Sequence, residues 1–279
     1  MGNFNWIVPT RFVFGKGVES ETGTWAKSEC REHALVVFGG GHVVRSGLLA
    51  AVTSSLEAAG VEVTELGGVR PNPEVTTVHE GIKLAREKQV VLVVLVGGGS
   101  VIDCSQAIAR GTRLDRDIWD VFSPESQAPF ADVLPLAVVL TIPAAGSESS
   151  DSCVISNDDL GLKSAIASDL IRARVAFIDP ELTMSLPAWQ TFVGVTDMCA
   201  HIMELFFSSS EDVISTANPH VPRRSATPRR PIRTCATICS GCSPRSWDSR
   251  QPSWDGSRAR AVRPGIRRQA QGITAEPSA

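Results

Sequence analysis

Three features are absent from this sequence of 279 residues, and each absence excludes a class of protein. No apolar stretch approaches the roughly 20 residues that cross a bilayer, so a membrane-spanning helix is excluded. The N-terminal residues Met1–Trp6 carry neither the basic nor the apolar region of a secretory signal. The cysteines up to residue 199 have no pairing spacing, which argues against a disulfide framework. We therefore expect a cytoplasmic globular protein, in agreement with a composition of 43% apolar and 20% charged residues.

The most informative stretch that is present runs from Val90 to Ala109. An uninterrupted apolar run, Val90–Val96, leads into the turn Gly97-Gly98-Gly99-Ser100 and then into a helical pattern. A strand that is apolar on both faces is typical of a parallel sheet covered by helices. Glycines allow a ligand to approach the backbone, and the start of the next helix favours an anion. On these residues alone, a phosphate-binding turn and a plain strand-to-helix turn remain alternatives.

The order of the other patterns predicts an α/β fold. A first glycine run, Gly39-Gly40-Gly41, also follows a short apolar strand. Strands that alternate with helices predict a parallel sheet with a ligand crevice at the carboxyl ends of the strands. The predicted strands are 5–14, 34–38, 61–66, 90–96, 134–141 and 174–179, and the predicted helices are 43–60, 74–87 and 190–207, with another starting after residue 100.

A possible metal site lies in the helix predicted over residues 190–207. Asp197 and His201 are four residues apart, so they share one face of that helix, as two ligands of a single ion would. A solvated contact between the two side chains, or a core histidine with a polar partner, gives the same spacing. The pair alone does not decide between these interpretations.

Eight short motifs follow one another in order along the chain between about residues 5 and 212. They are Phe14-Gly15-Lys16-Gly17, Gly39-Gly40-Gly41, Pro71-Asn72-Pro73, Gly97-Gly98-Gly99-Ser100 with Asp103, Thr141-Ile142-Pro143-Ala144-Ala145-Gly146-Ser147-Glu148-Ser149, Lys163, Asp179-Pro180, and Gly194-Val195-Thr196-Asp197-Met198-Cys199-Ala200-His201. This set resembles the iron-containing (group III) alcohol dehydrogenases, in particular the branch of butanol dehydrogenases and short-chain aldehyde reductases.

The resemblance implies a fold, a reaction and a site. It implies a Rossmann-like dinucleotide-binding domain over residues 1–186, and the first part of a truncated helical metal-binding domain over 187–212. Hydride would pass between NAD(P)(H) and a primary alcohol or aldehyde, with Asp197 and His201 as two ligands of Fe²⁺ or Zn²⁺. A homodimer formed through edges of the first domain is also implied. The cofactor-binding residues would be Gly40, Gly41, Asn72, Gly97, Gly98, Gly99, Ser100, Asp103, Thr141, Ser150, Lys163 and Leu182.

Two positions bear on how the cofactor would be held. No acidic residue follows the strand 34–38, and Arg45 lies nearby, which favours NADP over NAD. Arg45 as an ordinary solvated helix residue remains the alternative. Gln106 stands where the family usually has lysine, so one positive charge near the cofactor is missing.

The chain changes character after about residue 213. Residues 219–279 contain twelve arginines and no lysine against three acidic residues, with eight prolines and eight serines. This composition is typical of a shifted reading frame, and we expect residues 213–279 to be disordered. The two further histidine ligands of the family would then be missing, so we expect impaired or absent alcohol dehydrogenase activity.

Several alternatives remain open from the sequence. The first 212 residues could serve as a non-catalytic nucleotide-binding remnant, and the basic tail could bind nucleic acid, although we regard that partner as the weaker interpretation. The spacing of Cys235, Cys239 and Cys242 also matches the ligands of an iron–sulfur cluster in radical enzymes, although chance spacing explains it better. Polyol dehydrogenases and dehydroquinate-synthase-like enzymes share the broad architecture.

Overall fold

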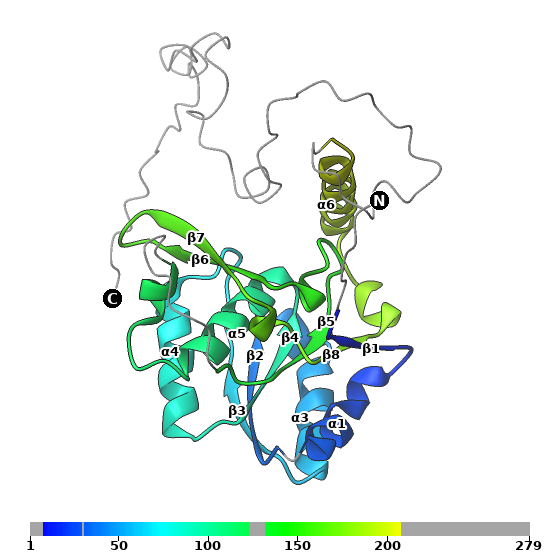
Figure 1. Cartoon of the computed structure of the whole chain (residues 1–279). Coiled ribbons are helices and arrows are strands. Elements are labelled where there is room, and N and C mark those ends of the chain that lie inside the picture. The colour runs from blue at the N-terminus through cyan, green and yellow to red at the C-terminus, as the bar shows by residue number, and fades with distance from the viewer. Residues whose placement is uncertain (1–7, 30, 123–131, 208–279) are drawn as a thin grey trace, which may run out of the picture. The chain divides into compact units, whose positions relative to one another are not determined.

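The structure is a computed structural model that describes residues 8–29, 31–122 and 132–207. Its centre is a six-stranded sheet in which every pair of neighbouring strands is parallel, in the order β1-β8-β5-β4-β2-β3 (Figure 1). The predicted α/β class and parallel pairing are confirmed. The strands are β1 (Arg11–Phe14), β2 (His33–Phe38), β3 (Glu62–Leu66), β4 (Leu92–Gly97), β5 (Leu136–Leu140) and β8 (Val175–Ile178).

Helices cover both faces of this sheet. One core cluster joins α4 and α5 to the sheet, and a second joins α1 and α3 to the other side. The helices are α1 (Thr22–Ser28), α2 (His42–Arg45), α3 (Leu48–Ala58), α4 (Val75–Glu87), α5 (Gly99–Gly111) and α6 (Ala188–Phe207).

The central strands β2, β4 and β5 are apolar on both faces because each face meets one of these helix layers. In β2, Leu35 and Val37 belong to the cluster with α4 and α5, whereas Ala34 and Val36 belong to the cluster with α1 and α3. All four side chains are fully buried. Each large apolar side chain buried in this way contributes roughly 1.5–3 kcal/mol. Alternate residues of β2 therefore pack against the helix layers on opposite faces of the sheet.

The order of the strands places a crevice beside β2. The chain passes from β2 to β3 on one side, and then returns to β4 on the other side of β2. Ligands of open parallel sheets bind where the strand order reverses in this way, beyond the carboxyl ends of the strands. The two glycine runs follow β2 and β4, so both lie at this switch point.

Three features differ from the sequence-based expectations. The single helix predicted over 43–60 is wrong, because Gly47 separates α2 from α3 with a left-handed φ of +79°. An antiparallel hairpin, β6 (Ser152–Asn157) with β7 (Leu162–Ala167), was not predicted. The strand predicted over 5–14 is seen as β1 alone, since residues 8–10 are not in a strand and 5–7 lie outside the described residues. The expected tail, 213–279, also lies outside them.

The end of the described chain is the 20-residue helix α6, which begins directly after Pro187. Gly194 brings this helix close to the sheet domain, because a Cβ at that position would lie 2.9 Å from the Pro143 carbonyl oxygen. Among the helices that the structure describes, none has the length and apolarity needed to span a membrane. The division into domains at residues 186 and 187 stays a prediction.

Candidate functional site

A cavity of about 720 Å³ opens at the switch point, between the carboxyl ends of β2 and β4. Most of its wall comes from the two glycine runs, the first turns of α2 and α5, and the segment that leads into α6. Its lining includes the predicted site residues Gly40, Gly97, Gly98, Gly99, Ser100, Thr141 and Leu182. The remaining predicted residues lie elsewhere, as described below.

The floor of this cavity is the turn between β4 and α5. Gly98 is the N-cap of α5 in an extended conformation, and its carbonyl accepts from the Val101 N–H at 3.0 Å. A Cβ on Gly98 would lie 3.1 Å from Cβ of Ile142, and a Cβ on Gly99 would lie 3.4 Å from Ser147 Oγ. The first N–H groups of a helix have no acceptor within the helix, and its dipole favours negative charge there. The turn therefore fits a pyrophosphate group, and a side chain at Gly98 would press on Ile142 beside it.

The end of β2 forms another part of the wall. Gly40 lines the cavity, whereas Gly41 does not, and serves instead as the N-cap of α2. A Cβ on Gly41 would lie 2.6 Å from Nη1 of Arg45, so the guanidinium covers this glycine. His42 and Ser185 also line the cavity, with 3.1 Å between His42 Nε2 and Ser185 Oγ. This part of the wall offers polar and cationic groups without an acidic residue from the end of β2.

A second cluster joins three predicted residues that are distant in sequence. Lys163 Nζ donates to Oδ1 of Asn72 at 2.8 Å, and Asn72 has a left-handed φ of +57°. Burial raises the pKa of Asp103 to about 7, while a hydrogen bond from the Val154 backbone and the charge of Lys163 act in the opposite direction. Pro71, next to Asn72, lines the cavity. The cluster of Asn72, Asp103 and Lys163 is therefore joined to the cavity wall along the chain, through Pro71.

The wall that carries Leu182 is held by one carboxylate. Asp179 accepts hydrogen bonds from the N–H groups of Gly17 at 2.7 Å and Glu181 at 2.8 Å. The Gly17 N–H is the main cause that lowers the pKa of Asp179, against the opposing effect of desolvation. The short helix Pro180–Thr183, which places Leu182 in the cavity wall, is thereby fixed to the loop after β1.

The last predicted cofactor residue, Ser150, precedes β6 and is not part of the cavity lining. Its Oγ accepts from the Ser152 N–H at 3.0 Å, and its carbonyl accepts from Gln106 Nε2 at 3.1 Å. Gln106 is buried in α5. The structure thus uses the amide at position 106 to hold the backbone of residue 150.

The two predicted metal ligands lie one turn apart on α6. Oδ1 of Asp197 and Nε2 of His201 are 3.9 Å apart, and both side chains retain exposed surface. No group of three or more histidine, cysteine or acidic side chains that could hold a metal ion occurs in the part of the chain that the structure describes. Iron and zinc sites need three or four protein ligands, so this pair fits as part of a ligand set.

Some residues of the cavity wall were not assigned a role from the sequence. Ser46, Glu181, Ser185 and Gln190 all line the cavity. Glu181 follows the Asp179-Pro180 motif, so the motif indicated the right segment without showing which side chain lines the cavity. The others come from segments with no distinctive pattern.

The parallel sheet, the switch-point cavity and the glycine turn at the start of α5 define an α/β protein of the doubly wound type. The family model described as iron-containing alcohol dehydrogenase matches residues 9–180. The chain therefore belongs to the iron-containing alcohol dehydrogenase family.

Similar proteins and solved structures agree with this assignment. Over 212 residues the chain is 41% identical to the probable NADH-dependent butanol dehydrogenase 2 of Bacillus subtilis, covering 76% of this chain and 54% of that protein. It is 36% identical over 214 residues to the NADPH-dependent aldehyde reductase YqhD of Escherichia coli, with the same coverage. The crystal structure of NADH-dependent butanol dehydrogenase A from Thermotoga maritima matches with a TM-score of 0.74 and 36% identity, over 78% of this chain and 54% of that one. The chain spans about half the length of the curated relatives that it matches.

Proposed function

We propose that the chain binds NADP(H) or NAD(H) in the switch-point cavity, with the pyrophosphate on the Gly97–Ser100 turn. The observation that supports this most is the cradle at Gly98, which opens at the start of α5 into a cavity of about 720 Å³. The adenosine end would lie toward Gly40 and Gly41. The nicotinamide end would lie toward Asn72, Asp103 and Lys163, with Thr141, Ser150 and Leu182 along the nucleotide.

NADP is our preferred cofactor of the two. A phosphate on the adenosine ribose would approach the end of β2, where an acidic residue would repel it. This end has Gly40 and Gly41, and the Arg45 guanidinium lies over Gly41. The relatives include proteins named for NADH and for NADPH, so the preference rests on these residues.

The reaction that we propose for this site is hydride transfer between the nicotinamide and a primary alcohol or aldehyde. Asp197 and His201 would hold the metal, Fe²⁺ or else Zn²⁺, which when bound polarises the oxygen of the substrate as a Lewis acid. The chain's own contribution is to fix the nicotinamide end through Asn72, Asp103 and Lys163. The described residues supply only two metal ligands. We therefore expect the chain to bind the nucleotide but to turn over substrate slowly or not at all. A non-catalytic nucleotide-binding module is the alternative.

The remaining parts of the proposal concern the whole chain. We propose residues 1–186 as the nucleotide-binding domain and 187–212 as the start of a helical metal-binding domain. The partners would be a small alcohol or aldehyde and a second copy of the chain, rather than nucleic acid or a membrane. We propose the cytoplasm as its location.

Titration of the full chain with NADPH and NADH, followed by nucleotide fluorescence, tests the proposal. We expect both to bind, with NADPH the tighter ligand. Gly98→Ala should weaken binding about tenfold or more, because its methyl group would lie 3.1 Å from Cβ of Ile142 and force the turn or this cavity-lining residue to shift. Ser54→Ala, on an exposed position of α3, is the control and should bind as the unmodified chain does.

The same preparation tests catalysis by oxidation of NADPH with butanal in the presence of Fe²⁺ or Zn²⁺. Binding without turnover would support the non-catalytic module. No binding of either nucleotide, or full affinity in Gly98→Ala, would overturn the proposed site.

A further inference from the structure

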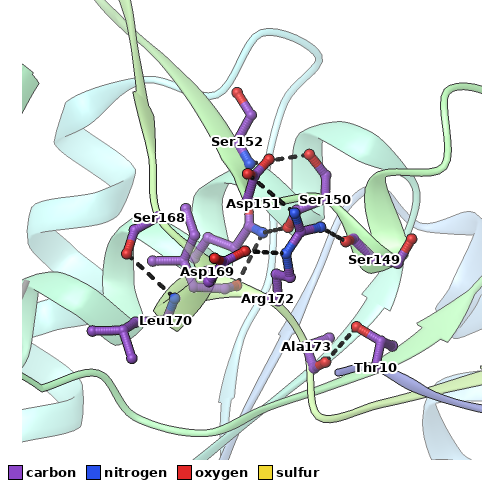
Figure 2. Close-up of polar contacts among 12 residues, drawn as sticks. Thr10, Ser149, Ser150, Asp151, Ser152, Ser168, Asp169, Leu170, Arg172 and Ala173 are labelled. Atoms are coloured by element: carbon purple, nitrogen blue, oxygen red, sulfur yellow. Dashed lines mark hydrogen bonds and ion pairs between the residues drawn. The ribbon is translucent and has the colours of Figure 1, made fainter. Parts of the chain in front are cut away.

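Arg172 uses all three of its nitrogen atoms to fix one loop. Nε donates to Oδ1 of Asp169 at 2.8 Å, Nη2 lies 3.1 Å from Oδ2 of Asp151, and Nη1 donates to the carbonyl of Ser149 (Figure 2). Only 19% of the arginine side chain is exposed. Charge-assisted hydrogen bonds in such a sheltered position are stronger than neutral ones. The guanidinium therefore joins the segment before β6 to the turn before β8.

Gln106 reinforces the same junction from α5. Its side chain is almost completely buried, and Nε2 donates to the carbonyls of Ser150 and Ile171, each at 3.1 Å. One amide thus holds residue 150 and the residue that precedes Arg172. The backbone carbonyl of Ser149 is therefore held by Arg172, and that of Ser150 by Gln106.

The segment held in this way adjoins the proposed nucleotide site. It continues from the short helix Ser147–Ser149. In that helix, Oγ of Ser147 would lie 3.4 Å from a Cβ placed on Gly99. Gly99 is part of the cavity lining and of the first turn of α5. Movement of Ser147–Ser150 would therefore change the wall next to the turn that we assign to the pyrophosphate.

We propose that Arg172 is a positioning residue for the dinucleotide, which with Gln106 holds Ser149 and Ser150 against the start of α5. The inference rests on the proposed nucleotide function. A planar guanidinium reaches three acceptors in different directions, whereas a lysine ammonium cannot reproduce this fork. Arg172 acts on the nucleotide through the backbone of Ser149 and has no role in the chemical step.

The test compares two ligands, NADPH and 2′-AMP, on the full-length chain. 2′-AMP has the adenosine and its 2′-phosphate but no pyrophosphate, so it occupies only the part of the proposed site toward Gly40, whereas NADPH also needs the turn beside Ser147–Ser150. Arg172→Gln should weaken NADPH binding about tenfold and leave 2′-AMP binding within about twofold, and Arg172→Lys should not restore NADPH affinity. Arg174→Gln is the matched control, because Arg174 pairs with Glu29 at 3.2 Å and is largely exposed.

Thermal unfolding of each variant separates positioning from a purely structural role. Equal loss of 2′-AMP and NADPH binding together with lower thermal stability, or unchanged NADPH binding in Arg172→Gln, would overturn the inference. If Arg172→Gln does not fold, Asp151→Ala removes one acceptor of the guanidinium, with about threefold weaker NADPH binding expected and full affinity overturning the inference. If the unmodified chain binds neither ligand, the proposed function fails, and the inference fails with it.

Discussion

Asp103 shows at the scale of a single residue how burial changes the chemistry of a carboxyl group. Burial raises its pKa to about 7, and the Val154 N–H and the Lys163 charge only partly oppose the effect. In the unfolded chain the pKa of an aspartate is near 3.9. Between about pH 4 and pH 7 the folded state therefore keeps a proton that the unfolded state has released. The contribution of Asp103 to stability must fall as pH rises through this window.

Asp103→Asn should remove this pH dependence. We expect the free energy of unfolding of the unmodified chain to fall by roughly 4 kcal/mol relative to Asp103→Asn between pH 4 and pH 8. Urea unfolding at several pH values measures the difference. Asp159→Asn, at an exposed turn position of the hairpin, should follow the unmodified chain. Parallel curves for Asp103→Asn and the unmodified chain would contradict the prediction.

The sequence could indicate only part of the residue-scale arrangement. The glycines at 97–99 were identifiable because a buried apolar run precedes them, and the structure places them in one cavity wall. Arg172 was not identifiable, because its partners are loop atoms brought together only by the fold. Gln106 was noticed as a departure from the family, but the sequence could not show that it holds Ser150.

Gly47 has a clear role at the scale of elements, because it ends α2 and begins α3. Its φ is +79°, and a Cβ there would meet no other atom within 4 Å. A substitution therefore tests backbone conformation without a steric clash from neighbouring atoms. L-residues other than glycine adopt this conformation at a cost of about 1–2 kcal/mol, and asparagine tolerates it better than alanine.

Gly47→Ala should lower the free energy of unfolding by about 1 kcal/mol, and Gly47→Asn should lower it less. Equilibrium unfolding in urea measures both. Alanine has a higher helix propensity than glycine. A Gly47→Ala variant that is more stable than the unmodified chain would therefore contradict this prediction, and would show that α2 and α3 can join into the single helix expected from the sequence.

The central elements were predictable, whereas the hairpin was not. Strands β2, β4 and β5 are buried on both faces, and this appears in the sequence as apolar runs. The β6 strand instead alternates, with Cys153 and Ile155 buried between less buried serine and valine positions. Its partner β7 buries only Ile166, so its pattern is too weak to predict a strand.

At the scale of the whole molecule, the pair formed by Asp197 and His201 is expected to bind a metal ion weakly. Asp197 and His201 are close enough to share an ion, but the described part of the chain offers no cluster of three possible ligands. Equilibrium dialysis with Zn²⁺ should give weak binding that falls about tenfold further in Asp197→Ala and in His201→Ala. His79→Ala, which removes another histidine paired with an aspartate, should have no effect. Tight binding that survives both α6 substitutions would contradict this prediction.

The α6 helix also exposes large apolar side chains. Trp189, Phe192 and Ile202 are 76%, 70% and 66% exposed. Exposed apolar surface of this kind favours association. Preparations for the binding experiments should therefore be checked for oligomers by light scattering.

The pairing of β1 with β8 has a consequence for synthesis of the chain. Arg11 pairs with Val175, and β1 has no other strand beside it in the sheet of the described residues. A ribosome adds roughly 5–20 residues per second, so β1 emerges on the order of ten seconds before its partner exists. During that time Phe12 and Phe14 are available to other chains in the cell. Of the strands that the structure describes, β1 is therefore made before the others in this sheet and is among the last to be paired.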